Sequence, residues 1–155
     1  MNRHWRLAVH EAGHAVAHVH LGGQVRLVSM QRPKHTGGHC WLADALPPWE
    51  SAIVALAGPA AELFIEDEPS RDHLDAVLRN ADEDIHDFPV AQRLADEGGF
   101  SYDQAGEAAA QLVLEQWAAV EAVARPLRGA RRGLMSGAKV SEIVANTRRG
   151  TAPSR

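Results

Sequence analysis

Two histidines separated by three residues stand near the start of the chain, in the sequence HEAGH at residues 10–14. In an α-helix, residues i and i+4 lie on the same face, so His10 and His14 can both reach one metal ion. Glu11 would project beside that ion and take a proton from water. Gly13 costs about 1 kcal/mol relative to alanine inside a helix, which indicates that another element packs closely there. The motif predicts a divalent metal site for amide hydrolysis, with Glu11 as the base.

Two imidazoles supply only part of a tetrahedral site, so a third protein ligand is needed. His18 continues the same helical face, but a helix rises about 12 Å over eight residues, which is too far for one ion. His20 occupies the last position of an HExxHxxGxxH pattern, but Ala17 replaces the glycine that would let the chain turn back. Glu62 and Asp84 remain as candidates on later elements, and spacing alone does not choose between them.

The elements that must position these residues are mainly helical. Capping residues, apolar periodicity and turn clusters predict a helix capped by Asn2 and ending near Gly22, followed by a hairpin built from QVRLVSM and HCWLA. A second helix opens at Pro47-Pro48 and is kinked or divided at Gly58-Pro59, and a third starts at Ala81. A long helix capped by Ser101 is ended or kinked by Pro126, and a closing helix covers VSEIVANTRR. Small residues at 57, 58, 60 and 61 would let another helix approach closely. The predicted fold class is therefore mainly α (α+β), with a small β-hairpin after the HExxH helix.

Length, composition and charge limit the class of protein to which this chain can belong. The chain has 155 residues, of which 45% are hydrophobic and 23% charged, as in one ordinary globular domain, here expected over residues 1–150 with a flexible tail at 151–155. Cys40 is the only cysteine, which rules out disulfides and fits a reducing compartment. No apolar run is long enough for a membrane span or a signal peptide, so we expect a cytoplasmic protein. The net charge of −4 argues against a nucleic-acid partner.

A family resemblance narrows these alternatives. The sequence HEAGHAV, the hairpin after it, the helix ALAGPAAELFIED and the segment ADEDI resemble the peptidase M41 family, the proteolytic domain of the FtsH proteases, over about residues 7–130. The resemblance implies a helical zincin-like metallopeptidase domain in which His10, His14 and Asp84 bind Zn²⁺ and Glu11 is the catalytic base.

The resemblance is less close around the third ligand. Glu83 stands where the family has asparagine, and Asp82 or Asp87 could take the place of Asp84. The resemblance also implies that the strand near residues 39–42 is a sheet edge onto which an extended substrate pairs.

The sequence also lacks one part of the family pattern. FtsH proteases carry an AAA ATPase, whereas no G-x-x-x-x-G-K-[ST] phosphate loop occurs in this chain. We therefore expect an ATP-independent, soluble zinc endopeptidase that hydrolyses peptides or unfolded proteins, acting as a homo-oligomer or with a separate ATPase partner. The competing hypothesis is a metal-stabilised binding or regulatory module without turnover. The intact Glu11 argues against that hypothesis.

Overall fold

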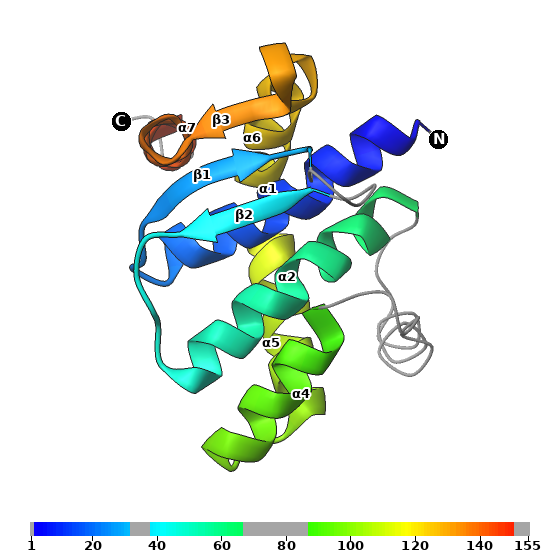
Figure 1. Cartoon of the computed structure of the whole chain (residues 1–155), viewed down its shortest axis with the longest axis vertical. Coiled ribbons are helices and arrows are strands. Elements are labelled where there is room, and N and C mark those ends of the chain that lie inside the picture. Colours follow the sequence, from blue (N-terminus) through cyan, green and yellow to red (C-terminus); the bar gives the residue numbers. More distant parts are fainter. Residues whose placement is uncertain (1, 32–37, 67–86, 151–155) are drawn as a thin grey trace.

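The fold is mainly helical, as predicted, with one small antiparallel sheet. The computed structural model describes residues 2–31, 38–66 and 87–150. These ranges contain helices α1 (Arg3–His20), α2 (Pro48–Glu66), α4 (Asp87–Gly98), α5 (Tyr102–Glu115), α6 (Trp117–Gly129) and α7 (Gly137–Gly150), the 3₁₀ helix η1 (Arg131–Gly133), and strands β1 (Val25–Ser29), β2 (His39–Leu42) and β3 (Leu134–Ser136) (Figure 1). Within them, no helix is long and apolar enough to cross a membrane.

Helix α1 is the centre of the molecule. It packs against α2, α6 and the sheet, and its apolar side chains are fully buried at positions such as Val9 and Val16. Its start follows from Asn2, whose side-chain oxygen accepts a hydrogen bond from the backbone N–H of His4 at 2.9 Å. The chain leaves the helix at Gly22, which has a φ of +94° that favours glycine. Both predicted ends of this helix are confirmed.

Helices α1 and α2 approach closely at small residues. A Cβ atom built at Gly13 would lie 2.6 Å from the carbonyl oxygen of Ala57 and 2.9 Å from the Cβ of Ala61. The close packing predicted from Gly13 and from the small residues of the second helix is therefore confirmed.

Of the two outcomes predicted at Gly58-Pro59, a kink or a division of the second helix, the division is wrong. Helix α2 runs from Pro48 to Glu66 with Pro59 inside it. Proline removes one helical hydrogen bond, but α1, α4 and α5 all pack against α2 and hold it in one piece. Tertiary packing thus outweighs the local preference of this dipeptide.

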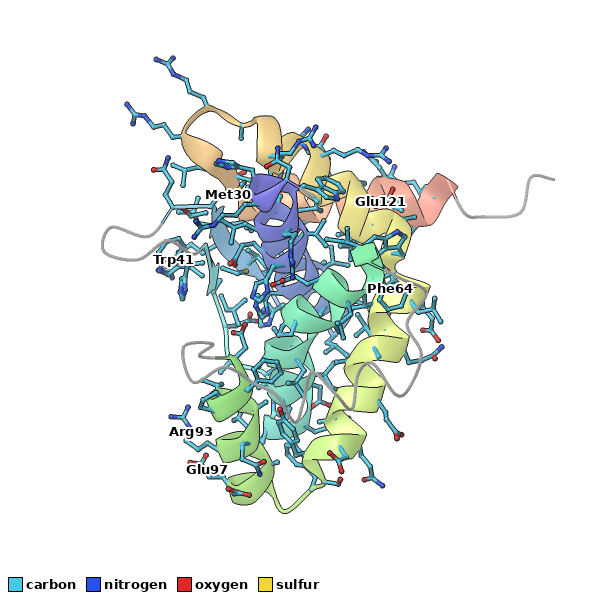
Figure 2. The ribbon with its side chains drawn as sticks, turned by 90° about the vertical axis from the view of Figure 1, so that its right-hand side faces the viewer. Met30, Trp41, Phe64, Arg93, Glu97 and Glu121 are labelled. Carbon is cyan, nitrogen blue, oxygen red and sulfur yellow. The ribbon has the colours of Figure 1, made fainter. Side chains whose placement is uncertain are left out.

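The sheet has the order β2-β1-β3, with β1 in the middle. The predicted hairpin is present as β1 and β2, while β3, with only three residues, was not predicted. Val28 of β1 pairs with Cys40 and with Met135, so these side chains share the face that packs on the core. Trp41 lies on the opposite face and is 39% exposed. Figure 2 shows its side chain on the outside of the molecule. Strand β2 is therefore an edge strand whose inner face turns toward α1.

The long helix predicted after Ser101 is in fact two helices. The Ser101 side chain caps α5, as predicted, by accepting from the backbone N–H of Gln104 at 3.3 Å. The chain then breaks at Gln116, and α6 continues through Pro126 to Gly129. The break lets α5 pack on α2 and α6 pack on α1, and Trp117 stacks on Phe64 at the junction with a centroid distance of 5.4 Å.

Two predictions lie outside the described residues. These are the helix start at Ala81 and the flexible tail at 151–155. In the described part, α4 begins at Asp87 and contains Pro89 in its first turn, where the missing N–H of proline does no harm.

Candidate metal centre

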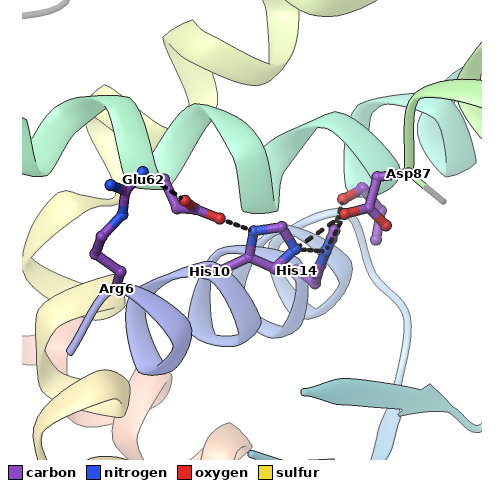
Figure 3. Close-up of polar contacts among 6 residues, drawn as sticks. Arg6, His10, His14, Glu62 and Asp87 are labelled. Carbon is purple, nitrogen blue, oxygen red and sulfur yellow. Dashed lines mark hydrogen bonds and ion pairs between the residues drawn. The ribbon is translucent and has the colours of Figure 1, made fainter. Parts of the chain in front are cut away.

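Three ligand atoms converge where α1 meets the start of α4. Nε2 of His10 lies 3.0 Å from Nε2 of His14 and 2.9 Å from Oδ2 of Asp87. Nε2 of His14 lies 3.3 Å from the same carboxylate oxygen. The two histidine side chains are 14% and 10% exposed and the Asp87 side chain is 25% exposed, so the cluster is largely shielded from water. Figure 3 shows the three side chains facing one another.

The Nδ1 atoms of His10 and His14, which are not part of the cluster, already have hydrogen-bond acceptors beside them. Nδ1 of His14 lies 2.7 Å from the backbone carbonyl oxygen of Val54, which can only accept a hydrogen bond. Nδ1 of His10 contacts a carboxylate oxygen of Glu62, which is also an acceptor when ionised. Each Nδ1 must therefore carry the proton, which leaves the Nε2 lone pairs of the neutral rings pointing at one another and at Asp87.

This arrangement is electrostatically unfavourable unless a positive charge fills it. Burial by itself would lower the pKa of His10, but hydrogen bonds to Asp87 and Glu62 outweigh burial and raise it to about 10. Burial by itself would lower the pKa of His14 as well, but the charge and hydrogen bond of Asp87, together with the charge of Glu11, outweigh burial and raise it. Burial opposes ionisation of Asp87, yet the two histidines bring its pKa far below the ordinary value. The site therefore attracts either protons or a metal cation.

The donor set fits a divalent metal such as zinc. Two imidazole nitrogens and one carboxylate oxygen are the ligands of many catalytic zinc sites, which keep a further position open for water. Ligand atoms about 2.1 Å from one ion in a tetrahedral arrangement lie about 3.4 Å apart, close to the separations seen here. His10, His14 and Asp87 also form the one group of potential metal ligands found among the described residues. Imidazole and carboxylate together also accept other divalent ions.

Glu62 lies behind His10 rather than among the ligand atoms. Its carboxylate contacts Nδ1 of His10 and also accepts a hydrogen bond from the Arg6 guanidinium at 3.1 Å. Burial opposes ionisation of Glu62, but His10 and Arg6 lower its pKa below the ordinary value, so it stays charged. Figure 3 shows Glu62 and Asp87 on opposite sides of the His10 ring. Glu62 therefore orients the His10 ring and fixes its tautomer, as carboxylates behind metal-bound histidines commonly do.

Glu11 follows His10 on α1 and is buried, with 4% of its surface exposed. A Cβ atom built at Gly38, at the entrance to β2, would lie 2.5 Å from Oε1 of Glu11. Burial, together with the charge of Glu11, raises the pKa of the nearby Cys40 thiol to about 12, so the thiol stays protonated at neutral pH. The predicted base is thus enclosed between α1 and the inner face of β2.

The other predicted candidates have different surroundings. Asp84 and Asp82 lie outside the described residues, so their positions remain predictions, and Asp87 is the acid that the described part brings to the histidines. Nε2 of His18 contacts Asp44 at 2.8 Å, and Nδ1 of His20 contacts Arg148 at 3.0 Å. Neither of these two histidines joins the cluster, as the sequence predicted.

Several contributors to the site had no signal in the sequence. The carbonyl of Val54 could not be predicted, because backbone groups carry no residue-specific pattern. Gly58 makes room for a ligand, since a Cβ atom there would lie 2.6 Å from Cε1 of His14. From the sequence, Gly58 was interpreted as a place where helices approach and as part of the dipeptide that would kink or divide the second helix.

No family model matches this chain, and no curated protein matches it significantly. The functional assignment therefore depends on the HEAGH motif and on the geometry of the site.

Proposed function

We propose that this protein is a zinc-dependent endopeptidase in which His10, His14 and Asp87 hold the metal and Glu11 is the general base. The observation that carries the proposal is the convergence of three lone pairs, from two Nε2 atoms and one carboxylate oxygen, beside a buried glutamate of the HEAGH motif. The resemblance of this motif and its flanking segments to the M41 peptidases supports the same reaction class. Asp87 takes the third ligand position in this proposal, in place of Asp84.

When bound, the zinc ion would lower the pKa of a coordinated water and polarise the carbonyl of the scissile bond. Glu11 then accepts a proton from the attacking water and delivers it to the leaving amine. The hydrogen bonds from His10 to Glu62 and from His14 to Val54 hold both imidazoles in the tautomer that presents Nε2. The close packing of α1 on α2 keeps these groups aligned through the reaction.

Peptides or unfolded protein segments are the proposed substrates. Strand β2 is an edge strand, and the residue before it lies close to Glu11, so an extended chain pairing with β2 would pass near the base. We propose that the hydrolysis step itself proceeds without ATP. A homo-oligomer or a separate ATPase partner, and a cytoplasmic location, also belong to the proposal.

The Glu11→Gln variant tests the mechanism. Glutamine keeps the size of the side chain but cannot accept the proton, so hydrolysis of fluorescein-labelled casein should fall by about 100-fold or more, while zinc content stays near that of the wild type. Glu97→Gln, on the exposed surface of α4, is the matched control and should change neither quantity. Unchanged hydrolysis in Glu11→Gln would overturn the peptidase mechanism. A wild-type protein that holds zinc and cleaves no peptide would favour the binding-module hypothesis.

A further inference from the structure

Gly38 stands at the entrance to β2 and is buried. It lies two residues before Cys40, so both positions turn toward α1 on the inner face of the sheet. The three atoms nearest to a Cβ atom built at Gly38 all belong to Glu11: Oε1 at 2.5 Å, Cγ at 2.6 Å and Cδ at 2.7 Å. The backbone of Gly38 therefore lies against the outer part of the Glu11 side chain, from Cγ to Oε1.

The backbone conformation does not require glycine at this position. The described glycines with positive φ are Gly22, Gly99 and Gly133, and Gly38 is not among them. An alanine could adopt the same conformation, so the reason for a glycine is steric. Glu11 is only 4% exposed, so its carboxylate cannot avoid an added methyl group by swinging into solvent and would have to change its position within the site.

We propose that Gly38 is a positioning residue for Glu11, because its bare backbone forms the wall that keeps the carboxylate directed at the metal ligands. This inference rests on the proposed function for the role of Glu11 as a base. The contact itself, and its effect on the placement of the side chain, can be measured without any hydrolysis.

Other glycines around α1 differ in what they contact. A side chain at Gly13 would meet the backbone of Ala57, so it would push two helices apart. A side chain at Gly58 would meet the ring of His14, a metal ligand. A side chain at Gly38 would meet the end of a flexible glutamate, so the fold and the ligands can stay in place while the carboxylate moves. Gly38→Ala should therefore separate hydrolysis from metal binding.

The experiment is a double-mutant cycle between Gly38→Ala and Glu11→Ala in the full chain with zinc added. Gly38→Ala should keep about one zinc per chain, lower the melting temperature by about 3–6 °C, and reduce kcat on fluorescein-labelled casein by about 100-fold with little change in KM. In the Glu11→Ala background the same glycine substitution should lower the melting temperature by no more than about 1 °C, because the clash is gone. Gly129→Ala is the matched control, since a Cβ atom there meets nothing within 4 Å.

A second variant distinguishes a specific effect on the position of Glu11 from a general destabilisation of the fold. In Gly38→Ala/Glu11→Asp the shorter side chain withdraws from the added methyl, so kcat should exceed that of Gly38→Ala alone. An equal loss of melting temperature in both Glu11 backgrounds, or hydrolysis by Gly38→Ala at the wild-type rate, would overturn the inference. A wild-type protein without hydrolysis would overturn the proposed function instead, and the cycle in melting temperature would still decide whether Gly38 positions Glu11.

Discussion

Asp87 is the first residue of α4, and its carboxylate faces both histidines of the HEAGH motif. We expect Asp87→Asn to weaken zinc binding by about 100-fold, because asparagine keeps the size of the side chain and removes the charge that balances the metal. Zinc content after dialysis, with affinity from chelator competition, measures this loss. Asp84→Asn is the matched control and should keep its zinc. Loss of zinc in Asp84→Asn with zinc retained in Asp87→Asn would restore Asp84 as the third ligand.

In the proposed zinc site, Glu62 would act on the metal through His10. Glu62→Gln should weaken zinc binding by about 10-fold, because the amide can still accept a hydrogen bond from Nδ1 but no longer makes the imidazole a stronger donor to the metal. Chelator competition measures the affinity, and Glu50→Gln, in the first turn of the same helix, is the control. A loss as large as that of His10→Ala would mean that Glu62 is itself a ligand.

At the scale of elements, the crossing of α1 and α2 positions the groups of the candidate metal site, because it brings Val54, Gly58 and Glu62 to the two histidines. Gly13 is the point of closest approach. Helix propensity alone would make Gly13→Ala stabilising, whereas the contact with the Ala57 backbone makes it destabilising.

We therefore expect Gly13→Ala to cost about 1–3 kcal/mol of unfolding free energy and to lower the melting temperature by several degrees. Urea denaturation of the metal-free protein gives the free energy without interference from zinc. Gly129→Ala, which has open space around it on α6, should show no comparable loss. A Gly13→Ala protein more stable than the wild type would contradict the close helix crossing.

For the whole molecule, the pKa values of the site make stability depend on pH in opposite ways with and without metal. In the metal-free protein the pKa of His10 is raised from 6.5 to about 10, so its stabilising effect is complete below pH 6.5 and is lost as the pH rises toward 10. The pKa of Asp87 is lowered, so its contribution is present above its ordinary value of 3.8 and is lost in acid. The chelated protein should therefore melt at lower temperatures as the pH rises above 6.5.

Zinc must displace the proton from His10, so metal binding strengthens as the pH rises. The difference in melting temperature between zinc-loaded and chelated protein should grow from pH 6 to pH 8, reaching about 5–10 °C at zinc concentrations near 100 times Kd. Differential scanning calorimetry across this range checks the trend. In His10→Ala the zinc-dependent difference should vanish, and a difference that does not change with pH in the wild type would contradict proton displacement.

Local signals predicted the elements that are capped or bounded by turns. The Asn2 and Ser101 caps and the Gly22 stop depend on contacts within a few residues, which a sequence pattern records, and the two hairpin strands follow from their residue types. The division at Gly58-Pro59 and the unbroken helix after Ser101 were wrong, because packing of α2 and α6 against distant helices outweighs local preference. Strand β3 was missed because a three-residue strand exists only through its pairing with β1.

The sequence by itself determined that this protein has a HEAGH helix whose two imidazoles share a face, because the geometry of one helix is local and independent of the rest of the fold. It also limited the third ligand to a small set of acids that included Asp87. Only the tertiary structure decided that Asp87 faces the histidines, that Glu62 lies behind His10, and that Gly38 confines Glu11. These relations join segments far apart in the chain, and their distances follow from how helices and strands pack together.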